Sequence, residues 1–225
     1  MLPILEQKDD LLKRLAEHRL LVLSSPTGSG KSTQIPQFLT ELSGEGKILV
    51  LQPRRLAARV LAERVAHERH GSVGDEVGYQ VKQDNRTATH TRIIYMTEGV
   101  LLRQLHNNAQ LKGIDWVVMD EFHERNWQTD FLLAYLKKLK KERPNFGLVV
   151  MSATLDSDGL DDYLLPLLPE GSTSDDLICR LQGRQFPVEI SYRDFPISVP
   201  TWEQAGKACK DLWFREKEGD VLIFM

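Results

Sequence analysis

Short apolar runs and longer stretches with helical spacing alternate along this sequence. The apolar runs are typical of strands that are buried on both faces of a sheet. We predict strands at residues 20–24, 47–52, 116–120 and 146–151, with shorter candidates at 76–81 and 91–96. We predict helices at residues 8–18, 33–42, 55–69, 98–105 and 128–141. Because strands that alternate with such helices form βαβ units, the predicted fold class is α/β, with a mostly parallel sheet and helices on both faces.

The pattern changes near residue 169. Residues 169–176 are polar and turn-rich, which is typical of a loop. Beyond this loop we predict a strand at 183–192, a helix at 202–217 and a buried strand at 221–225. We therefore predict two domains, residues 1–178 and residues 179–225. Because a buried strand needs neighbours in a sheet, we expect the second domain to be truncated, with its remainder beyond Met225.

Composition narrows the function classes only modestly. Of the 225 residues, 41% are hydrophobic and 27% are charged, which is ordinary for a globular protein. The net charge of −3 means that a nucleic-acid partner would need a local basic patch. The two cysteines, Cys179 and Cys209, lack metal-ligand spacing and fit a reducing compartment. Because no signal-peptide pattern or membrane-length apolar run is present, we expect a cytoplasmic protein without a membrane partner.

A glycine-rich segment, Ser25-Pro-Thr-Gly-Ser-Gly-Lys-Ser32, follows the first predicted strand and precedes a helix. It matches the end of the phosphate-loop pattern G-x-x-x-x-G-K-[ST], with Ser25 in place of the first glycine. Backbone N–H groups of such a loop bind phosphates, Lys31 supplies a positive charge, and the Ser32 hydroxyl is suited to Mg²⁺. The predicted nucleotide-binding residues are Ser25, Pro26, Thr27, Gly28, Ser29, Gly30, Lys31, Ser32 and Thr33. The alternative is a flexible Gly/Ser turn.

Two acids, Asp120 and Glu121, follow the apolar run Trp116–Met119. Carboxylates at the carboxyl end of a buried parallel strand lie at the edge where open α/β sheets bind ligands. We expect Asp120 to hold Mg²⁺ and Glu121 to polarise the attacking water, because phosphoryl transfer depends on positioning and charge neutralisation. The alternative, which is compatible with this role, is that the two acids cap the helix that follows.

The segment Asp120-Glu-Phe-His-Glu-Arg125 resembles motif II of the DEAH-box helicases of superfamily 2, with Phe122 where most members have Ala. Further segments resemble other motifs of that family in the same order. They are 26–34 (motif I), 53–58 (Ia), 97–101 (Ib), 152–154 (III), 183–188 (the segment that joins two RecA-like domains) and 221–225 (the start of motif IV). The Phe122 variant is similar to the bacterial HrpB type. The resemblance implies a RecA-like P-loop NTPase domain, the beginning of a second RecA-like domain, ATP and Mg²⁺ as cofactors, and ATP-dependent RNA helicase activity.

The resemblance also assigns roles to individual residues. Lys31, Asp120, Glu121 and His123 are the implied catalytic residues, and Ser32, Asp120 and Glu121 are the implied metal ligands. Ser152, Ala153 and Thr154 are implied to couple hydrolysis to strand movement, and Arg64 is implied to stack on adenine. Each role has an alternative. His123 could be a structural histidine at a helix start, and Ser152 and Thr154 could form a plain ST-turn after a strand. Arg64 could lie on a solvated helix face.

Single-stranded nucleic acid is the partner that the resemblance implies, RNA rather than DNA. Arg54 and Arg55 follow a strand and suit phosphate contacts, and Thr97, Glu98 and Gly99 open a helix where one more phosphate can bind. Such contacts hold the backbone without base preference. The basic run Lys137–Arg143 is expected to be the solvated end of a helix. We expect Trp127 to pack in the core.

No segment resembles motifs V and VI, which include arginines supplied by the second RecA-like domain of the family. The resemblance therefore implies that this domain is a missing partner in cis and that the chain turns over ATP weakly by itself. One alternative is a nucleotide-dependent RNA-binding or scaffold module without unwinding activity. A third possibility, a P-loop ATPase such as a kinase or transporter subunit, does not account for the ordered segments 53–55, 97–99 and 152–154.

Overall fold

The structure is a computed structural model that describes residues 2–26, 28–154, 159–181, 189–196, 198–217 and 219–223. The chain divides into two compact units, Met1–Arg184 and Gln185–Met225. The first unit extends past residue 178, because strand β8 (Ile178–Arg180) pairs with β1 (Leu20–Ser24). The functional assignment of the two parts stays a prediction.

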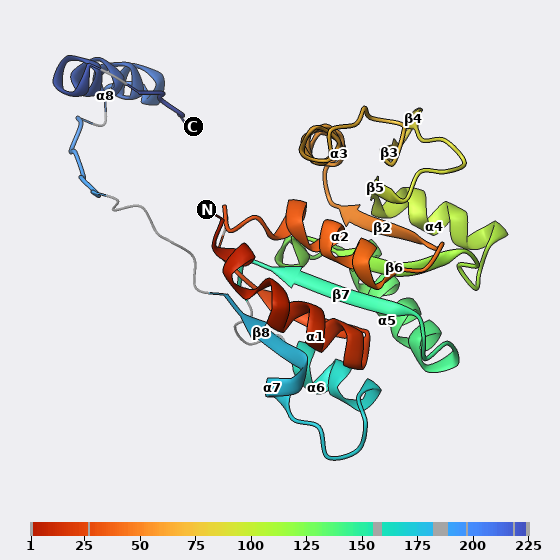
Figure 1. Cartoon of the computed structure of the whole chain (residues 1–225). Helices are drawn as coiled ribbons and strands as arrows, with labels where there is room; N and C mark the ends of the chain where they lie inside the picture. The colour runs from red at the N-terminus through yellow and green to blue at the C-terminus, as the bar shows by residue number, and fades with distance from the viewer. Residues whose placement is uncertain are drawn as a thin grey trace. The chain divides into compact units, whose positions relative to one another are not determined.

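An eight-stranded sheet forms the centre of the first unit, in the order β4-β3-β5-β2-β6-β7-β1-β8. Figure 1 shows its long central strands. The remaining strands are β2 (Lys47–Gln52), β3 (Val77–Val81), β4 (Asp84–Arg86), β5 (Ile93–Thr97), β6 (Ile114–Met119) and β7 (Gly147–Ser152). All neighbouring strands are parallel except β3 and β4. The predicted α/β class and the mostly parallel sheet are confirmed.

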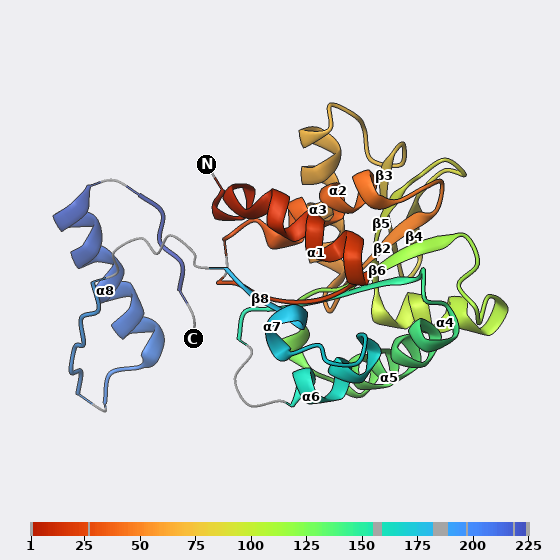
Figure 2. The same cartoon turned by 60° about the horizontal axis from the view of Figure 1, so that its bottom comes forward.

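Helices cover both faces of this sheet, as Figures 1 and 2 show. One face packs against α1 (Lys8–His18), α2 (Lys31–Leu42) and α3 (Arg55–Glu68), and the other against α4 (Glu98–Asn107), α5 (Trp127–Glu142), α6 (Leu160–Leu164) and α7 (Ser174–Leu177). A hydrophobic core lies on each face of the sheet, and successive residues of β1 alternate between them. Leu20 and Val22 pack in one core, and Leu21 and Leu23 pack in the other. Alternation in a parallel sheet therefore places apolar residues in both cores.

Some elements were not predicted because they are short. The antiparallel strand β4 and the edge strand β8 each have three residues, and η1 (Pro3–Gln7), η2 (Phe122–Glu124) and η3 (Leu165–Leu167) are single 3₁₀ turns. The predicted loop 169–176 is interrupted by α7, which begins with a capping box of Thr173 and Asp176. These elements are too short to show a periodicity.

The second unit consists mainly of α8 (Thr201–Glu216), which confirms the helix predicted at 202–217. The strand predictions there are wrong for the described residues: 189–192 and 221–223 are exposed and form no strand. A buried parallel strand needs partners on both sides, and the described part of this unit offers none. Residues 183–188 and 224–225 of the predicted strands lie outside the described residues.

Candidate nucleotide site and nucleic-acid cleft

Three consecutive strands bring the nucleotide-site segments together. β6, β7 and β1 are neighbours in the sheet, and their carboxyl ends lead to Asp120, to Ser152–Thr154 and to the phosphate loop, respectively. The backbone N–H of Ser25 donates to the carbonyl oxygen of Ser152 at 3.1 Å, which ties the loop to β7. The phosphate loop, Asp120 and residues 152–154 are far apart in the sequence but lie together at the carboxyl edge of the sheet.

The backbone of the phosphate loop turns sharply before α2. Gly28 and Gly30 have φ angles of 80° and 93°, a region that favours glycine. A Cβ on Gly30 would lie 2.9 Å from Cδ1 of Leu2. The Ser29 hydroxyl is buried and has no hydrogen-bond partner among the described residues. The amino end of α2 and this unpartnered hydroxyl favour binding of an anion, because donors there lack acceptors.

The remaining loop residues support this turn. The carbonyl oxygen of Pro26 accepts from the N–H of Ser29 at 3.4 Å, and the Thr33 hydroxyl donates to the carbonyl of Gly30 at 3.1 Å. Thr27 lies outside the described residues.

Lys31 and Glu121 face each other across the site. Lys31 is 3% exposed, and its Nζ lies 3.5 Å from Oε1 of Glu121. A buried ammonium needs a nearby negative charge, and Glu121 provides the carboxylate in this structure. Glu121 has a φ of 51°, which is a left-handed conformation that is uncommon for a residue other than glycine, and its side chain makes no capping hydrogen bond. The capping alternative for Glu121 is therefore not what the structure shows.

Asp120 is almost completely buried beside Ser32. Its Oδ2 accepts from Nε2 of Gln52 at 2.6 Å, and its Oδ1 accepts from the N–H of Glu121 at 2.9 Å. Burial raises the pKa of Asp120, against the opposing effects of hydrogen bonds to Ser32 and Gln52. A buried carboxylate next to a hydroxyl is a donor set that suits Mg²⁺.

His123 connects the acidic segment, residues 120–125, to the end of β7. Its Nδ1 accepts from the N–H of Ala153 at 3.3 Å and lies 3.5 Å from Oε2 of Glu121. Since Nδ1 accepts, the neutral ring carries its proton on Nε2. The Ser152 hydroxyl donates to the carbonyl of Thr154, and the Thr154 N–H donates back at 3.3 Å. This geometry is an ST-turn, and it holds Ala153 against His123.

Arg64 borders a cavity of about 320 Å³ at the phosphate loop. Gly28, Lys31 and Glu121 line the same cavity. The Arg64 guanidinium donates to Glu68 at 2.6 Å, and Glu68 also accepts from Gln34 and Gln37 at 2.9 and 2.8 Å. Burial acts to raise the pKa of Glu68, but the hydrogen bonds from Arg64, Gln37 and Gln34 outweigh it and lower the pKa. Glu68 thus fixes Arg64 at the rim of the cavity.

Four of the five residues expected to contact nucleic acid line a second cleft of about 520 Å³, and Arg54 does not line it. Its lining includes Arg55, Thr97, Glu98 and Gly99, together with Lys82, Arg103 and Gln128, which were not predicted. The Glu98 side chain serves an internal role: it is 7% exposed and accepts from the Thr129 hydroxyl at 2.6 Å and from Asn126 Nδ2 at 2.9 Å. Arg54 is exposed and pairs with Glu124 at 2.9 Å.

Sequence reasoning missed Gln52 and Tyr95. Gln52 ends β2, so its position at a strand end was a usable signal. Tyr95 lies within β5, and its hydroxyl donates to the carbonyl oxygen of Ser32 at 2.8 Å. Burial raises the pKa of Tyr95 well above its usual value, so the hydroxyl remains a donor. No local pattern pointed to this contact, because it joins residues that are far apart in the sequence.

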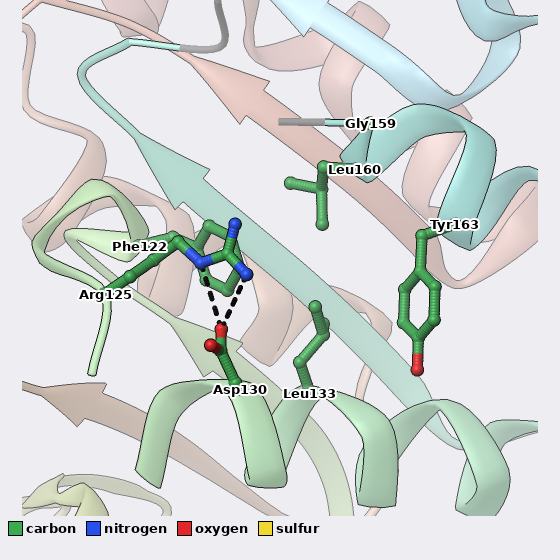
Figure 3. Close-up of a pocket in the computed structure, with 7 residues that line it drawn as sticks. All are labelled: Phe122, Arg125, Asp130, Leu133, Gly159, Leu160 and Tyr163. Carbon is green, nitrogen blue, oxygen red and sulfur yellow. Dashed lines mark hydrogen bonds and ion pairs between the residues drawn. The ribbon is translucent and has the colours of Figure 1, made fainter. Parts of the chain in front are cut away.

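Phe122 sits beside a cavity of about 340 Å³ beneath the acidic segment, between α5 and α6. Figure 3 shows Leu133, Leu160 and Tyr163 on the other walls and the Arg125–Asp130 ion pair at one side. Phe122 is 3% exposed. The expectation that Trp127 packs in the core is wrong: its side chain is 71% exposed, because α5 turns Leu132, Leu133 and Leu136 inwards instead.

A glycine-rich loop with a buried lysine after β1, and two acids after the parallel strand β6, define a P-loop nucleotide-binding protein. The sequence matches the DEAD/DEAH box helicase family over residues 5–163, so the chain belongs to that family. Membership in this family implies binding of a nucleoside triphosphate. No helix among the described residues is long and apolar enough to cross a membrane.

Individual relatives agree with this assignment. The crystal structure of the Escherichia coli DEAH/RHA helicase HrpB matches with a TM-score of 0.85 and 37% identity, over 100% of this chain and 28% of that chain. The ATP-dependent RNA helicase HrpA of Escherichia coli is 35% identical over 100% of this chain and 17% of its own length. The ATP-dependent RNA helicase dhx29 of Xenopus laevis is 36% identical over 99% of this chain and 16% of its own. The chain therefore spans less than a third of these relatives.

Proposed function

We propose that this chain is the ATP-binding, first RecA-like domain of an ATP-dependent RNA helicase of the HrpB type, which couples hydrolysis to movement along single-stranded RNA. The observation that carries the proposal is the convergence of Lys31, Asp120 and Glu121 at the carboxyl ends of β1 and β6. The similarity to HrpB over the whole chain supports the type.

The residues present fit ATP with Mg²⁺. Gly28 and Gly30 have positive φ angles, so a larger residue at either position would strain the backbone of the loop. The Ser29 hydroxyl has no hydrogen-bond partner among the described residues. Ser32 and Asp120 would hold Mg²⁺, directly or through water, and Lys31 would contact the β- and γ-phosphates. Bound Mg²⁺ supplies charge neutralisation on the phosphates.

Lys31 and Glu121 neutralise each other in this structure, and this pairing suggests how binding prepares the site. A triphosphate competes for the Lys31 ammonium, because phosphate oxygens are stronger partners than a carboxylate at 3.5 Å. Glu121 then loses its cation and becomes free to accept a hydrogen bond from the attacking water. The left-handed backbone at Glu121 aims its side chain into the site rather than along η2.

His123 and the ST-turn provide a route from hydrolysis to movement. His123 bonds to the N–H of Ala153 and lies near Glu121, so a change at Glu121 reaches the end of β7 through a single side chain. Arg55, Lys82 and Arg103 give the second cleft the positive charge that holds RNA phosphates without base preference.

The test is the steady-state ATPase rate of this chain with and without single-stranded RNA, alongside nucleotide affinity. Lys31→Ala should abolish nucleotide binding, and Glu121→Gln should remove turnover while binding persists. Glu142→Gln is the matched control, because Glu142 lies at the far end of α5 and bonds to Gln110. If the chain binds nucleotide but its ATPase rate stays near background, the ATPase site is incomplete and needs groups from a second domain. Unchanged nucleotide affinity in Lys31→Ala would refute the proposal.

A further inference from the structure

A third cleft, lined by basic residues, lies at the opposite edge of the sheet from the nucleotide site. It lies at the amino ends of β1 and β7, and its volume is about 670 Å³. The end of α1, the end of α5 and the segment 166–169 line it. Neither the nucleotide site nor the nucleic-acid cleft shares a lining residue with it.

Lys140 is the unexpected residue of this cleft. The basic run Lys137–Arg143 was predicted to be a solvated helix end, but Lys140 is only 6% exposed. Its Nζ donates to the carbonyl oxygen of Pro144 at 2.6 Å. An ammonium group has three donors, and the described residues give that of Lys140 a carbonyl acceptor but no carboxylate partner. Burial of a charge with a single carbonyl acceptor costs free energy.

Arg19 lies on the same cleft and is also incompletely satisfied. Its guanidinium stacks over the ring of Trp116 at 4.4 Å, and its Nε is buried without a hydrogen-bond partner among the described residues. Burial lowers the pKa of Arg19, against the raising effect of Asp115. His18 and Lys141 add further basic groups to the lining, and Glu17 is the one carboxylate among the lining residues.

The buried Lys140 ammonium and the partly buried Arg19 guanidinium repel each other. Burial lowers the pKa of Lys140 to about 8, and the positive charge of Arg19 acts in the same direction. An anion between Arg19 and Lys140 would remove this repulsion and accept their unused donors. Oxyanions with several acceptor oxygens suit a planar guanidinium and an ammonium together.

We propose that this cleft binds a phosphate group between Arg19 and Lys140. The phosphate comes either from free inorganic phosphate or from a nucleic-acid backbone. The cleft is large enough for a group bigger than one phosphate, so both sources fit its volume of about 670 Å³.

Chemical labelling of Lys140 gives a local readout that the phosphate loop cannot disturb. The intact chain is treated with trinitrobenzenesulfonate, and labelling of each lysine is followed by mass spectrometry. Inorganic phosphate and a short single-stranded RNA are added in separate arms. We expect phosphate to protect Lys140 but not Lys138, whose side chain is 76% exposed and lies near Glu142. Stronger protection by RNA at lower concentration assigns the phosphate to a nucleic-acid strand.

Binding by variants separates the cleft from the phosphate loop. Phosphate affinity is measured by calorimetry in a Lys31→Ala background, with Lys140→Met and Arg19→Asn as test variants and Lys138→Met as control. Asn is chosen because Arg19 has a φ of 50°, a conformation that Asn tolerates. Each test variant should weaken binding about tenfold, the effect of one charge-assisted hydrogen bond. Equal affinity in all three variants, or no protection of Lys140 by either ligand, overturns the proposal. Circular dichroism verifies that the variants are folded.

Discussion

Tyr95 supports the phosphate loop by replacing a hydrogen bond that α2 cannot make. In a regular α-helix the carbonyl of Ser32 accepts from the N–H of residue 36. Residue 36 is a proline inside α2, so that donor does not exist, and the proline ring crowds the Ser32 carbonyl. The Tyr95 hydroxyl donates to this carbonyl at 2.8 Å. We predict that Tyr95→Phe destabilises the fold through this contact.

The magnitude follows from what the substitution removes. The ring stays buried, so packing is unchanged, and the loss is one hydrogen bond plus an acceptor without a partner. Because Ser32 is only partly buried, we expect a cost of about 1.5 kcal/mol, in the lower half of the range for such acceptors. For a chain of this length that lowers the Tm by about 3–6 °C. Urea denaturation and thermal unfolding measure both quantities.

A double-mutant cycle with Pro36→Ala tests the cause. An alanine at position 36 would restore the missing N–H, so Tyr95→Phe should cost less in that background, by about 0.5–1 kcal/mol. Tyr79→Phe is the matched control, because its hydroxyl donates to Asp84 at 2.9 Å, away from α2. If Tyr95→Phe costs the same in the Pro36→Ala background as in the native chain, the reasoning about the missing donor is wrong.

Three further predictions concern the site. Because burial raises the pKa of Asp120, the folded state binds its proton more tightly than the unfolded state, so ionised Asp120 destabilises the ligand-free protein above its ordinary pKa of 3.8. Asp120→Asn should therefore raise the free energy of unfolding at neutral pH, with the gain vanishing below pH 3.8, as urea titrations across pH would show. Phe122→Ala should cost about 3 kcal/mol, the low end for Phe truncation, because the ring already borders a cavity; a cost below about 1 kcal/mol contradicts its packing role. Glu68→Gln should change stability by less than about 1 kcal/mol but weaken adenine-nucleotide binding, and equal binding would argue against a role for Arg64.

Local patterns were sufficient for the central strands and for the phosphate loop. The apolar runs of β1, β2, β6 and β7 are buried on both faces, so their composition alone identified them. The loop was found because its glycines and Lys31 are contiguous. Tyr95 and Gln52 could not be found in this way, because their partners lie on other strands and helices.

Residue type alone does not identify the buried face of a helix in this protein. Leu56 and Val60 share a helical spacing with Val65 but are 71% and 52% exposed, while Ala58 and Ala62 face the core. Lys140 shows the opposite error: it follows Leu136 by one helical turn, on the inward face, although its charge suggested solvent. Position on a helix decided burial in both cases, and residue type did not.

The order of the strands explains why the site can act as one unit. β7 lies between β1 and β6, so the segment that follows β7 touches both the phosphate loop and the acidic segment. One hydrogen bond joins Ser25 to Ser152, and another joins Ala153 to His123. The first bond joins two backbone groups, and the second joins the backbone N–H of Ala153 to the imidazole ring of His123. Under the proposed function, a change in the charge balance of Lys31 and Glu121 would reach residues 152–154 through these two bonds.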